Sequence, residues 1–165
     1  MRYRRSLIPG GTFFFTVNLA DRQSGLLTMH IELLRETTRS IRQRHPFEIL
    51  AMVVLPDHLH AIWRLPEGDA DYPARWALIK AGFSRALPKI ESIRESRVRK
   101  RERGIWQRRY WEHQIRDDGD LVRHVDYVHF NPVKHGYVEH AVGWRYSSIH
   151  RFVREGRSSG TWGMQ

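Results

Sequence analysis

The hydrophobic residues of this chain recur with two different periods, and the changes of period outline its elements. Residues 13–19 are aromatic and β-branched, which favours a strand. In residues 29–44 the apolar positions recur every three or four residues with arginines between them, which predicts a helix. Residues 47–55 form a nearly continuous apolar run, and a Pro-Asp turn separates them from residues 58–65. These two segments predict a β-hairpin.

The second half of the chain continues the alternation of helix and strand. Helical spacing resumes over residues 74–87, and the aromatic pattern of residues 105–115 predicts a strand. Aspartates that can serve as N-caps precede a helix predicted over 121–131, which Pro132 is expected to end or kink. A short helix is expected over 149–153.

The predicted order is βαββαβ followed by a further helix. This order predicts an α+β fold, a ferredoxin-like or RRM-like antiparallel sheet with helices on one face, plus an added helix over residues 121–131. A chain of 165 residues is long enough for one hydrophobic core of this kind. The fold serves RNA-binding modules and enzymes alike, so it does not select a function.

Charge and cysteine content narrow the function classes. The chain has 28 Lys and Arg against 18 Asp and Glu, a net charge of +10, which indicates a polyanionic partner and above all nucleic acid. It has no cysteine, so disulfides, thiolate zinc sites and a cysteine nucleophile are excluded. No apolar run approaches the roughly 20 residues that cross a bilayer. We therefore expect no membrane association and a cytoplasmic location.

Basic residues concentrate between positions 94 and 109, where the sequence has eight basic residues and two acidic ones. Such a run is typical of a solvated loop, and a loop of this charge can also contact DNA phosphates. The aromatic residues Trp106, Tyr110 and Trp111 could stack unpaired bases, although we expect at least half of them to be buried. The expected DNA-binding residues are Arg4, Arg5, Arg99, Lys100, Arg101, Arg103, Arg108 and Arg109.

Two histidines lie at the start of the second strand of the predicted β-hairpin. Residues two apart on a strand point to the same face, so His58 and His60 can converge on one cation while Leu59 points into the core. Packing alone would favour Val or Ile at these positions. Two histidines in a chain that has ten are a weak signal by themselves. Imidazole ligands alone do not decide whether the bound ion would be zinc or a harder ion such as Mg²⁺.

The helix predicted over 121–131 carries a second set of polar groups. Tyr127 and Asn131 are four residues apart and therefore share a face, with His124 about one turn earlier and Lys134 just beyond. A tyrosine on an amphipathic helix is more often a core residue. The polar and basic neighbours of Tyr127 argue for a functional face.

Several stretches together resemble a known family. His58-Leu59-His60 has the His-hydrophobic-His form, and residues 127–136, YVHFNPVKHG, resemble the tyrosine helix of single-tyrosine HUH transposases. Residues 66–69 (PEGD), 106–113 (WQRRYWEH) and 144–148 (WRYSS) narrow the resemblance to the REP-associated tyrosine transposases, bacterial proteins linked to repetitive extragenic palindromes. The resemblance spans about residues 13–150.

The resemblance implies a catalytic site. His58, His60 and Asn131 would hold a divalent cation, Mg²⁺ or Mn²⁺, and Tyr127 would attack the DNA backbone to form a 5′-phosphotyrosine. The phosphodiester would be exchanged without hydrolysis, so the same site could rejoin DNA. His124 and Lys134 are candidates for the proton acceptor or for contacts to a base or phosphate.

The resemblance also implies the substrate and the organisation of the chain. The substrate would be single-stranded DNA, a REP hairpin with an adjacent guide tetranucleotide. Residues 1–135 would form the HUH catalytic domain, and residues 136–165 an extension packing on the domain or the DNA. The sequence leaves the oligomeric state open between a monomer, which we favour, and a dimer with shared sites. The expected location is the bacterial cytoplasm, in association with the nucleoid.

Two other functions fit part of the pattern. A non-catalytic RNA- or DNA-binding module would use the basic run and the aromatic strand without cutting. A metal-dependent nuclease would use the histidines and water, but it is disfavoured because Asp57 is the only acidic residue next to them in sequence.

Overall fold

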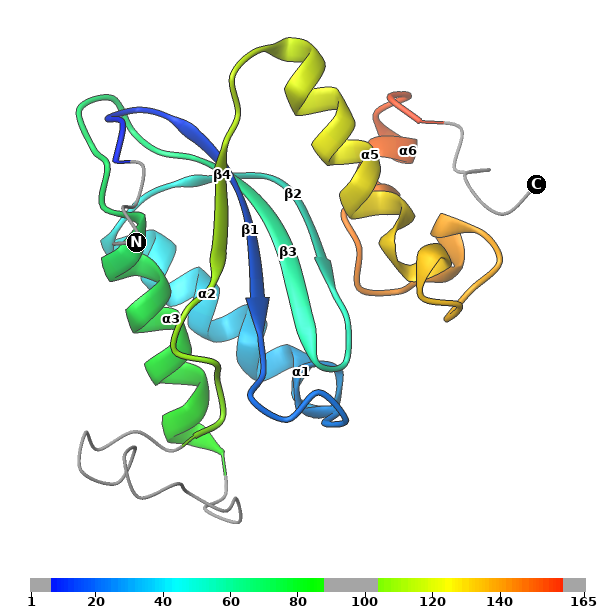
Figure 1. Cartoon of the computed structure of the whole chain (residues 1–165), viewed down its shortest axis with the longest axis horizontal. Coiled ribbons are helices and arrows are strands. Elements are labelled where there is room, and N and C mark those ends of the chain that lie inside the picture. Colours follow the sequence, from blue (N-terminus) through cyan, green and yellow to red (C-terminus); the bar gives the residue numbers. More distant parts are fainter. Residues whose placement is uncertain (1–6, 88–103, 159–165) are drawn as a thin grey trace, which may run out of the picture.

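A four-stranded antiparallel sheet forms the centre of the molecule (Figure 1). The computed structural model describes residues 7–87 and 104–158. The strands, in the spatial order β2-β3-β1-β4, are β1 (Thr12–Asn18), β2 (Glu48–Val54), β3 (His58–Arg64) and β4 (Trp111–Gln114). β2 and β3 pair antiparallel, which confirms the predicted β-hairpin.

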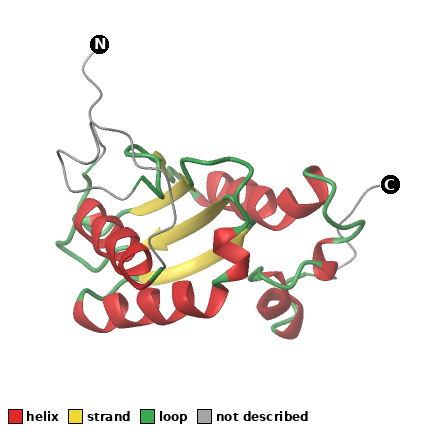
Figure 2. Ribbon diagram, turned by 90° about the horizontal axis from the view of Figure 1, so that it is seen from below, coloured by secondary structure: helices red, strands yellow, loops and turns green. Residues whose placement is uncertain are grey.

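Helices cover both faces of this sheet (Figure 2). The helices are α1 (Leu26–Met29), α2 (Ile31–Arg44), α3 (Tyr72–Ala86), α5 (Asp118–Lys134), the 3₁₀ turn η1 (Ala141–Gly143) and α6 (Ile149–Arg154). α2 and α3 share one hydrophobic cluster with the sheet, and α5 and α6 share a second one. The predicted α+β fold is confirmed, and the added helix α5 lies on the face opposite α2 and α3.

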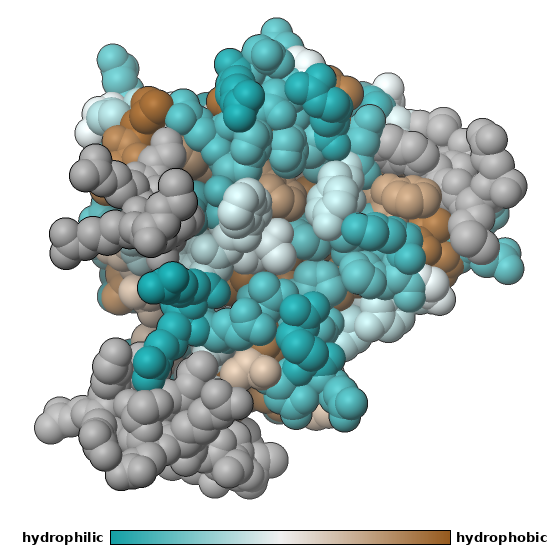
Figure 3. Space-filling model, in the orientation of Figure 1, coloured by the Kyte–Doolittle hydropathy of each residue, from teal (hydrophilic) through white to brown (hydrophobic). Residues whose placement is uncertain are grey.

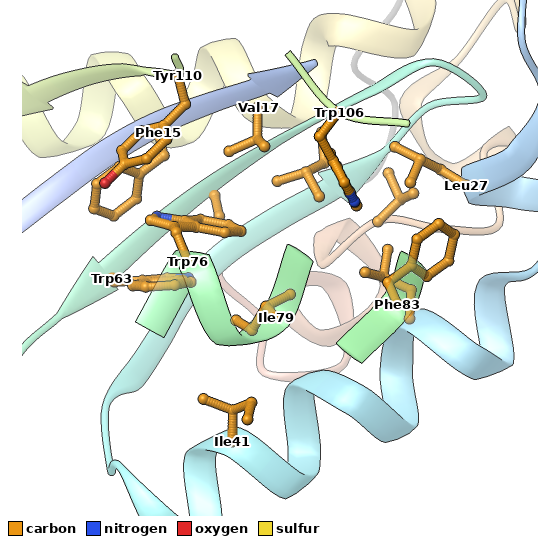
Figure 4. Close-up of a cluster of buried hydrophobic side chains, with 14 of the residues drawn as sticks. Phe15, Val17, Leu27, Ile41, Trp63, Trp76, Ile79, Phe83, Trp106 and Tyr110 are labelled. Atoms are coloured by element: carbon orange, nitrogen blue, oxygen red, sulfur yellow. The ribbon is translucent and has the colours of Figure 1, made fainter. Parts of the chain in front are cut away.

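The larger cluster is built on alternate residues of the central strands. Leu59, Ala61 and Trp63 of β3 point toward α2 and α3 and are at most 1% exposed. Trp63 stacks on Trp76 of α3 with ring centroids 4.1 Å apart, in the aromatic layer visible in Figure 4. The prediction that Leu59 points into the core is confirmed.

The smaller cluster lies under α5. Phe14 of β1 and Ile62 of β3 meet Val128 of α5 and Phe152 of α6. The neighbouring positions of the same face are polar, because His58 and His60 share the alternation with Ile62. The outer surface seen in Figure 3 is mostly hydrophilic with scattered hydrophobic patches.

The predicted strand over residues 105–115 is too long. Only Trp111–Gln114 form β4, and Trp106 makes an isolated bridge to Leu19. Trp106 and Tyr110 turn into the main cluster instead, and the Trp106 indole N–H donates to the carbonyl of Lys80. Backbone hydrogen bonds to the end of β1 continue at Ile105 and Gln107, so the strand is interrupted only between this bridge and Trp111.

The helix boundaries differ from the predictions by up to three residues. α5 begins three residues earlier than predicted, where Asp117 accepts a hydrogen bond from the backbone N–H of Asp120, so the expected N-cap is confirmed. Pro132 does not end the helix, which runs on to Lys134. A proline so near the helix end removes only one backbone hydrogen bond from the last turn. The helix predicted from residue 29 begins at Ile31, after the short α1.

The chain after α5 packs back onto the sheet. Val53 of β2 bridges Ser147, and the indole N–H of Trp144 donates to the Val54 carbonyl. The predicted division at residue 135 stays a prediction. Within the described ranges, none of the helices has the length and hydrophobicity that a membrane span requires.

Candidate active site

β3 brings His58 and His60 side by side on the face that α5 covers. Their ring centroids lie 5.0 Å apart, and the two residues are 4% and 3% exposed. The predicted sharing of one face by the two imidazoles is confirmed. Each ring has one nitrogen engaged by a neighbour, and the other nitrogen is left for a ligand.

A carboxylate holds His58, and a hydroxyl holds His60. His58 Nδ1 lies 2.9 Å from Asp57 Oδ1, and the other oxygen of Asp57 accepts from Arg22 Nε at 2.6 Å. His60 Nδ1 lies 2.8 Å from Thr16 Oγ1 on β1. Because a carboxylate can only accept, His58 keeps its proton on Nδ1 and leaves the Nε2 lone pair for a ligand.

Tyr127 lies beside this pair and reaches the surface. Its ring centroid is 5.2 Å from that of His60, its side chain packs edge-on against Phe14, and the residue is 39% exposed. The ammonium of Lys134 lies 5.0 Å from the centre of the Tyr127 ring. A phenol in this position is open to a large substrate and has a cation close by.

Asn131 lies one turn after Tyr127 and is fully buried. Neither its amide oxygen nor its amide nitrogen has a hydrogen-bond partner among the described residues, and the same holds for His60 Nε2. Leaving such groups unpaired costs about 1–3 kcal/mol each, so native proteins rarely do so without a reason. The amide oxygen of Asn131 and Nε2 of His60, together with the neighbouring imidazole of His58, fit a divalent cation.

Burial and local charge keep His60 neutral. Burial first, and then the positive potential of His58, His135 and Lys134, lower the pKa of His60 to about 3. Burial would raise the pKa of Asp57, but its hydrogen bonds with Arg22 and His58 outweigh that effect and lower it. A neutral imidazole is the form that binds a metal.

Sequence reasoning did not select four residues of this site. His135, the C-cap of α5, has its ring centroid 5.3 Å from that of His58, and burial together with the charge of His58 lowers the pKa of His135. Thr16 and Asp57 form hydrogen bonds with the two central histidines, and Arg22 donates to Asp57. His135 falls in the YVHFNPVKHG stretch, whereas pairing between strands and loops brings in Thr16 and Arg22.

A second polar cluster joins β4 to the first turns of α5. His113 Nε2 lies 2.9 Å from Asp120 Oδ2, His124 Nδ1 lies 3.2 Å from Asp120 Oδ1, and the two rings stack at 4.5 Å. These ligand atoms lie within 4.8 Å of one another, so the cluster could hold a divalent ion. The hydrogen bond from His113 is the main cause that lowers the pKa of Asp120 to about 2. His124 lies here, against Phe14.

Most of the predicted DNA-binding residues lie outside the described ranges. These are Arg4, Arg5, Arg99, Lys100, Arg101 and Arg103. Arg108 and Arg109 are exposed beside β4. Of the three aromatic residues considered for base stacking, Trp106 and Tyr110 are buried and Trp111 is 59% exposed, as expected for at least half of them.

Comparisons with known proteins give the family. No family model matches the chain. It is 47% identical over 162 residues to a Haemophilus influenzae protein named for the REP-associated tyrosine transposases, covering 98% of this chain and 92% of that protein. It is 47% identical over 154 residues to the REP-associated tyrosine transposase of Escherichia coli, covering 93% of this chain and 86% of that protein.

A solved structure agrees with these relatives. It is the structure of a REP-associated tyrosine transposase bound to a REP hairpin, and it is 44% identical to this chain with a TM-score of 0.87. The similarity covers 100% of this chain and 92% of that one.

Proposed function

Because this chain belongs to the REP-associated tyrosine transposase family, we propose that it cuts and rejoins single-stranded DNA next to REP-type hairpins, with Tyr127 as the nucleophile. A relative of similar fold has been solved bound to a REP hairpin, which supports a DNA hairpin as the partner. The net charge of +10 supports a polyanionic substrate.

The juxtaposition of Tyr127 with partnerless buried polar atoms carries this proposal. A half-exposed phenol lies next to His60 and one turn before Asn131, whose amide atoms lack partners among the described residues. Buried polar atoms without partners cost free energy until a ligand satisfies them. Here they are available for a divalent cation and for the oxygens of a phosphodiester.

The chemical step exchanges one phosphate ester for another. The Tyr127 oxygen attacks the phosphorus in line, the bond from phosphorus to the 3′ oxygen breaks, and a 5′-phosphotyrosine forms. The phenol loses its proton and the departing 3′ oxygen gains one, so no water is consumed. The reverse attack by a 3′-hydroxyl rejoins DNA and returns the free phenol without ATP.

His58 and His60 through Nε2, with the Asn131 side-chain oxygen, would hold Mg²⁺ or Mn²⁺. When bound, such an ion relieves the charge that develops on the phosphoryl oxygens. Asp57 and Thr16 orient the two imidazoles. The Lys134 ammonium favours the developing phenolate electrostatically, and His124 stays a candidate proton acceptor.

A covalent-adduct assay tests the proposal. The protein is mixed with a fluorescent REP hairpin that carries unpaired flanks, with Mn²⁺ or with a chelator, and separated under denaturing conditions. We expect a protein-linked product with Mn²⁺ that is absent in Tyr127→Phe. Tyr137→Phe is the matched control, because Tyr137 is a nearby tyrosine that is 47% exposed.

Three outcomes separate the alternatives. An adduct of equal yield in Tyr127→Phe would remove the nucleophile. Hydrolysed DNA ends without linked protein would support a water-dependent nuclease. Tight hairpin binding that the chelator does not change, with no cleavage by any variant, would show that the protein is a non-catalytic DNA-binding module.

A further inference from the structure

A groove on the far side of the sheet from Tyr127 has the chemistry of a nucleotide-binding site. It has a volume of about 370 Å³ and lies between α2, the edge strand β2 and residues 146–148. Residues 146–148 run along β2, because Val54 N–H donates to the Tyr146 carbonyl and Val53 bridges Ser147.

Three arginines form one wall of this groove. Arg35, Arg39 and Arg42 are spaced by four and three residues, so they share one face of α2. Arg39 is exposed and makes no hydrogen bond or ion pair with any residue in the described ranges. Arg42 donates to the Phe47 carbonyl and Arg35 pairs with Glu32. None of the described residues that line the groove is acidic.

The rest of the groove is apolar and aromatic. Leu34, Met52 and Val54 line it together with Tyr146, and the Arg35 guanidinium lies 5.8 Å from the centre of the Tyr146 ring. A row of cations beside an aromatic ring and an apolar surface is the combination that binds unpaired nucleotides. The cations hold phosphates, and the bases stack or pack on the apolar wall.

The groove is close to the candidate active site through the sheet. Met52 and Val54 line the groove, while Val53 between them is paired with His60 in the register of β2 and β3. Val53 alone therefore lies between two groove residues of β2 and next to His60, a proposed metal ligand on β3. Residues 146–148 cover the outer edge of β2, so a DNA strand leaving the region of Tyr127 would pass over them to reach the groove.

We propose that this groove binds an unpaired segment of the DNA substrate, with phosphates on Arg35 and Arg39 and a base against Tyr146. The proposal rests on the proposed function, because it takes DNA as the partner. It adds a binding surface made by α2 and residues 146–148, none of which was among the DNA-binding residues expected from the sequence.

Fluorescence anisotropy with two probes tests this surface. The probes are a DNA hairpin carrying a ten-nucleotide unpaired flank and the same hairpin without the flank. Arg39→Gln should weaken binding of the flanked probe about fivefold at 0.1 M salt and reduce the salt slope by about 0.7, the loss of one single-strand phosphate contact. Arg44→Gln, on the same helix but outside the groove, should leave both values unchanged.

A second pair of variants tests base stacking. Tyr146→Ala should remove most of the preference for the flanked probe, whereas Tyr146→Phe keeps the ring and should preserve it. Equal affinities for Arg39→Gln and Arg44→Gln, or equal losses on both probes, would overturn the groove assignment. At saturating DNA, Arg39→Gln should still form the covalent adduct, because the chemistry at Tyr127 does not depend on the groove. Adduct formation therefore tests the proposed function separately from the groove.

Discussion

The two faces of the sheet differ although the same strands build them. On β3, Leu59, Ala61 and Trp63 face α2 and α3 inside a dense aromatic cluster. His58 and His60 alternate with them and face α5, where the Asn131 amide and His60 Nε2 have no partner among the described residues. On the packed face the indole nitrogens of Trp63 and Trp76 are likewise without a partner there, but they belong to large apolar rings. One face is optimised for packing, and the other keeps polar groups that packing alone would exclude. Residues that stabilise the fold and residues of the candidate site therefore lie on opposite faces of β3. Substitutions on one face can be compared with substitutions on the other.

The largest expected effect is on the packed face. Trp63→Ala should lower the free energy of unfolding by about 4 kcal/mol, because it removes a buried ring stacked at 4.1 Å on Trp76 and leaves a cavity. Urea unfolding measures this loss. Trp111→Ala is the control, since that ring is 59% exposed and its removal should change the free energy of unfolding by less than about 0.5 kcal/mol. Similar losses in the two variants would contradict the contrast.

The second effect is pH-dependent and concerns the link between β4 and α5. Asp120 accepts hydrogen bonds from His113 and from the Arg116 backbone, and Asp120→Asn should cost about 2 kcal/mol at pH 7. The pKa of Asp120 is lowered to about 2 in the folded protein, so this stabilisation is present above the ordinary aspartate range. It should be lost as the pH falls from about 4 toward 2.

Unfolding of wild type and Asp120→Asn at several pH values between 3 and 7 measures this difference. Asp118→Asn is the control, because it removes an aspartate from the same first turn of α5. A stability difference for Asp120→Asn that stays constant down to pH 3 would contradict the ionised hydrogen-bonded state.

Local periodicity predicted most elements because it directly reflects which face of an element is buried. The alternation in residues 58–65 predicted the shared face of His58 and His60, and the four-residue spacing predicted that of Tyr127 and Asn131. The strand over residues 105–115 was predicted too long for the same reason, since Trp106 and Tyr110 have strand-like spacing but pack individually into the core.

Contacts between distant segments could not be predicted in this way. Thr16 reaches His60 only because β1 pairs with β3, and Arg22 reaches Asp57 across 35 positions of sequence. The α2 groove likewise depends on residues 146–148 running along β2. A single sequence carries no signal for such pairings, whereas i, i+2 and i, i+4 relations follow from the geometry of one element.

The third effect concerns the orientation of the imidazole. Thr16→Val removes the hydroxyl that holds His60 Nδ1 at 2.8 Å, so Mn²⁺ affinity should fall about tenfold while the fold persists. Calorimetric titration with Mn²⁺ measures the affinity. Thr12→Val is the matched control, since Thr12 lies on the same strand, four residues before Thr16, and faces the same side of the sheet. Equal affinities in the two variants would show that the hydroxyl does not position the ligand.

The smallest effect tests the polar face directly. Asn131→Leu replaces a fully buried amide, partnerless among the described residues, by an apolar group of similar size. In the presence of a chelator, the free energy of unfolding of Asn131→Leu, measured with urea, should therefore be about 1 kcal/mol higher than that of wild type. With Mn²⁺ the order should reverse, because only the wild type gains the full free energy of ligand binding. A large loss in the chelator would mean that the amide has a partner in the folded protein, and the strongest argument for a metal at this site would then fail.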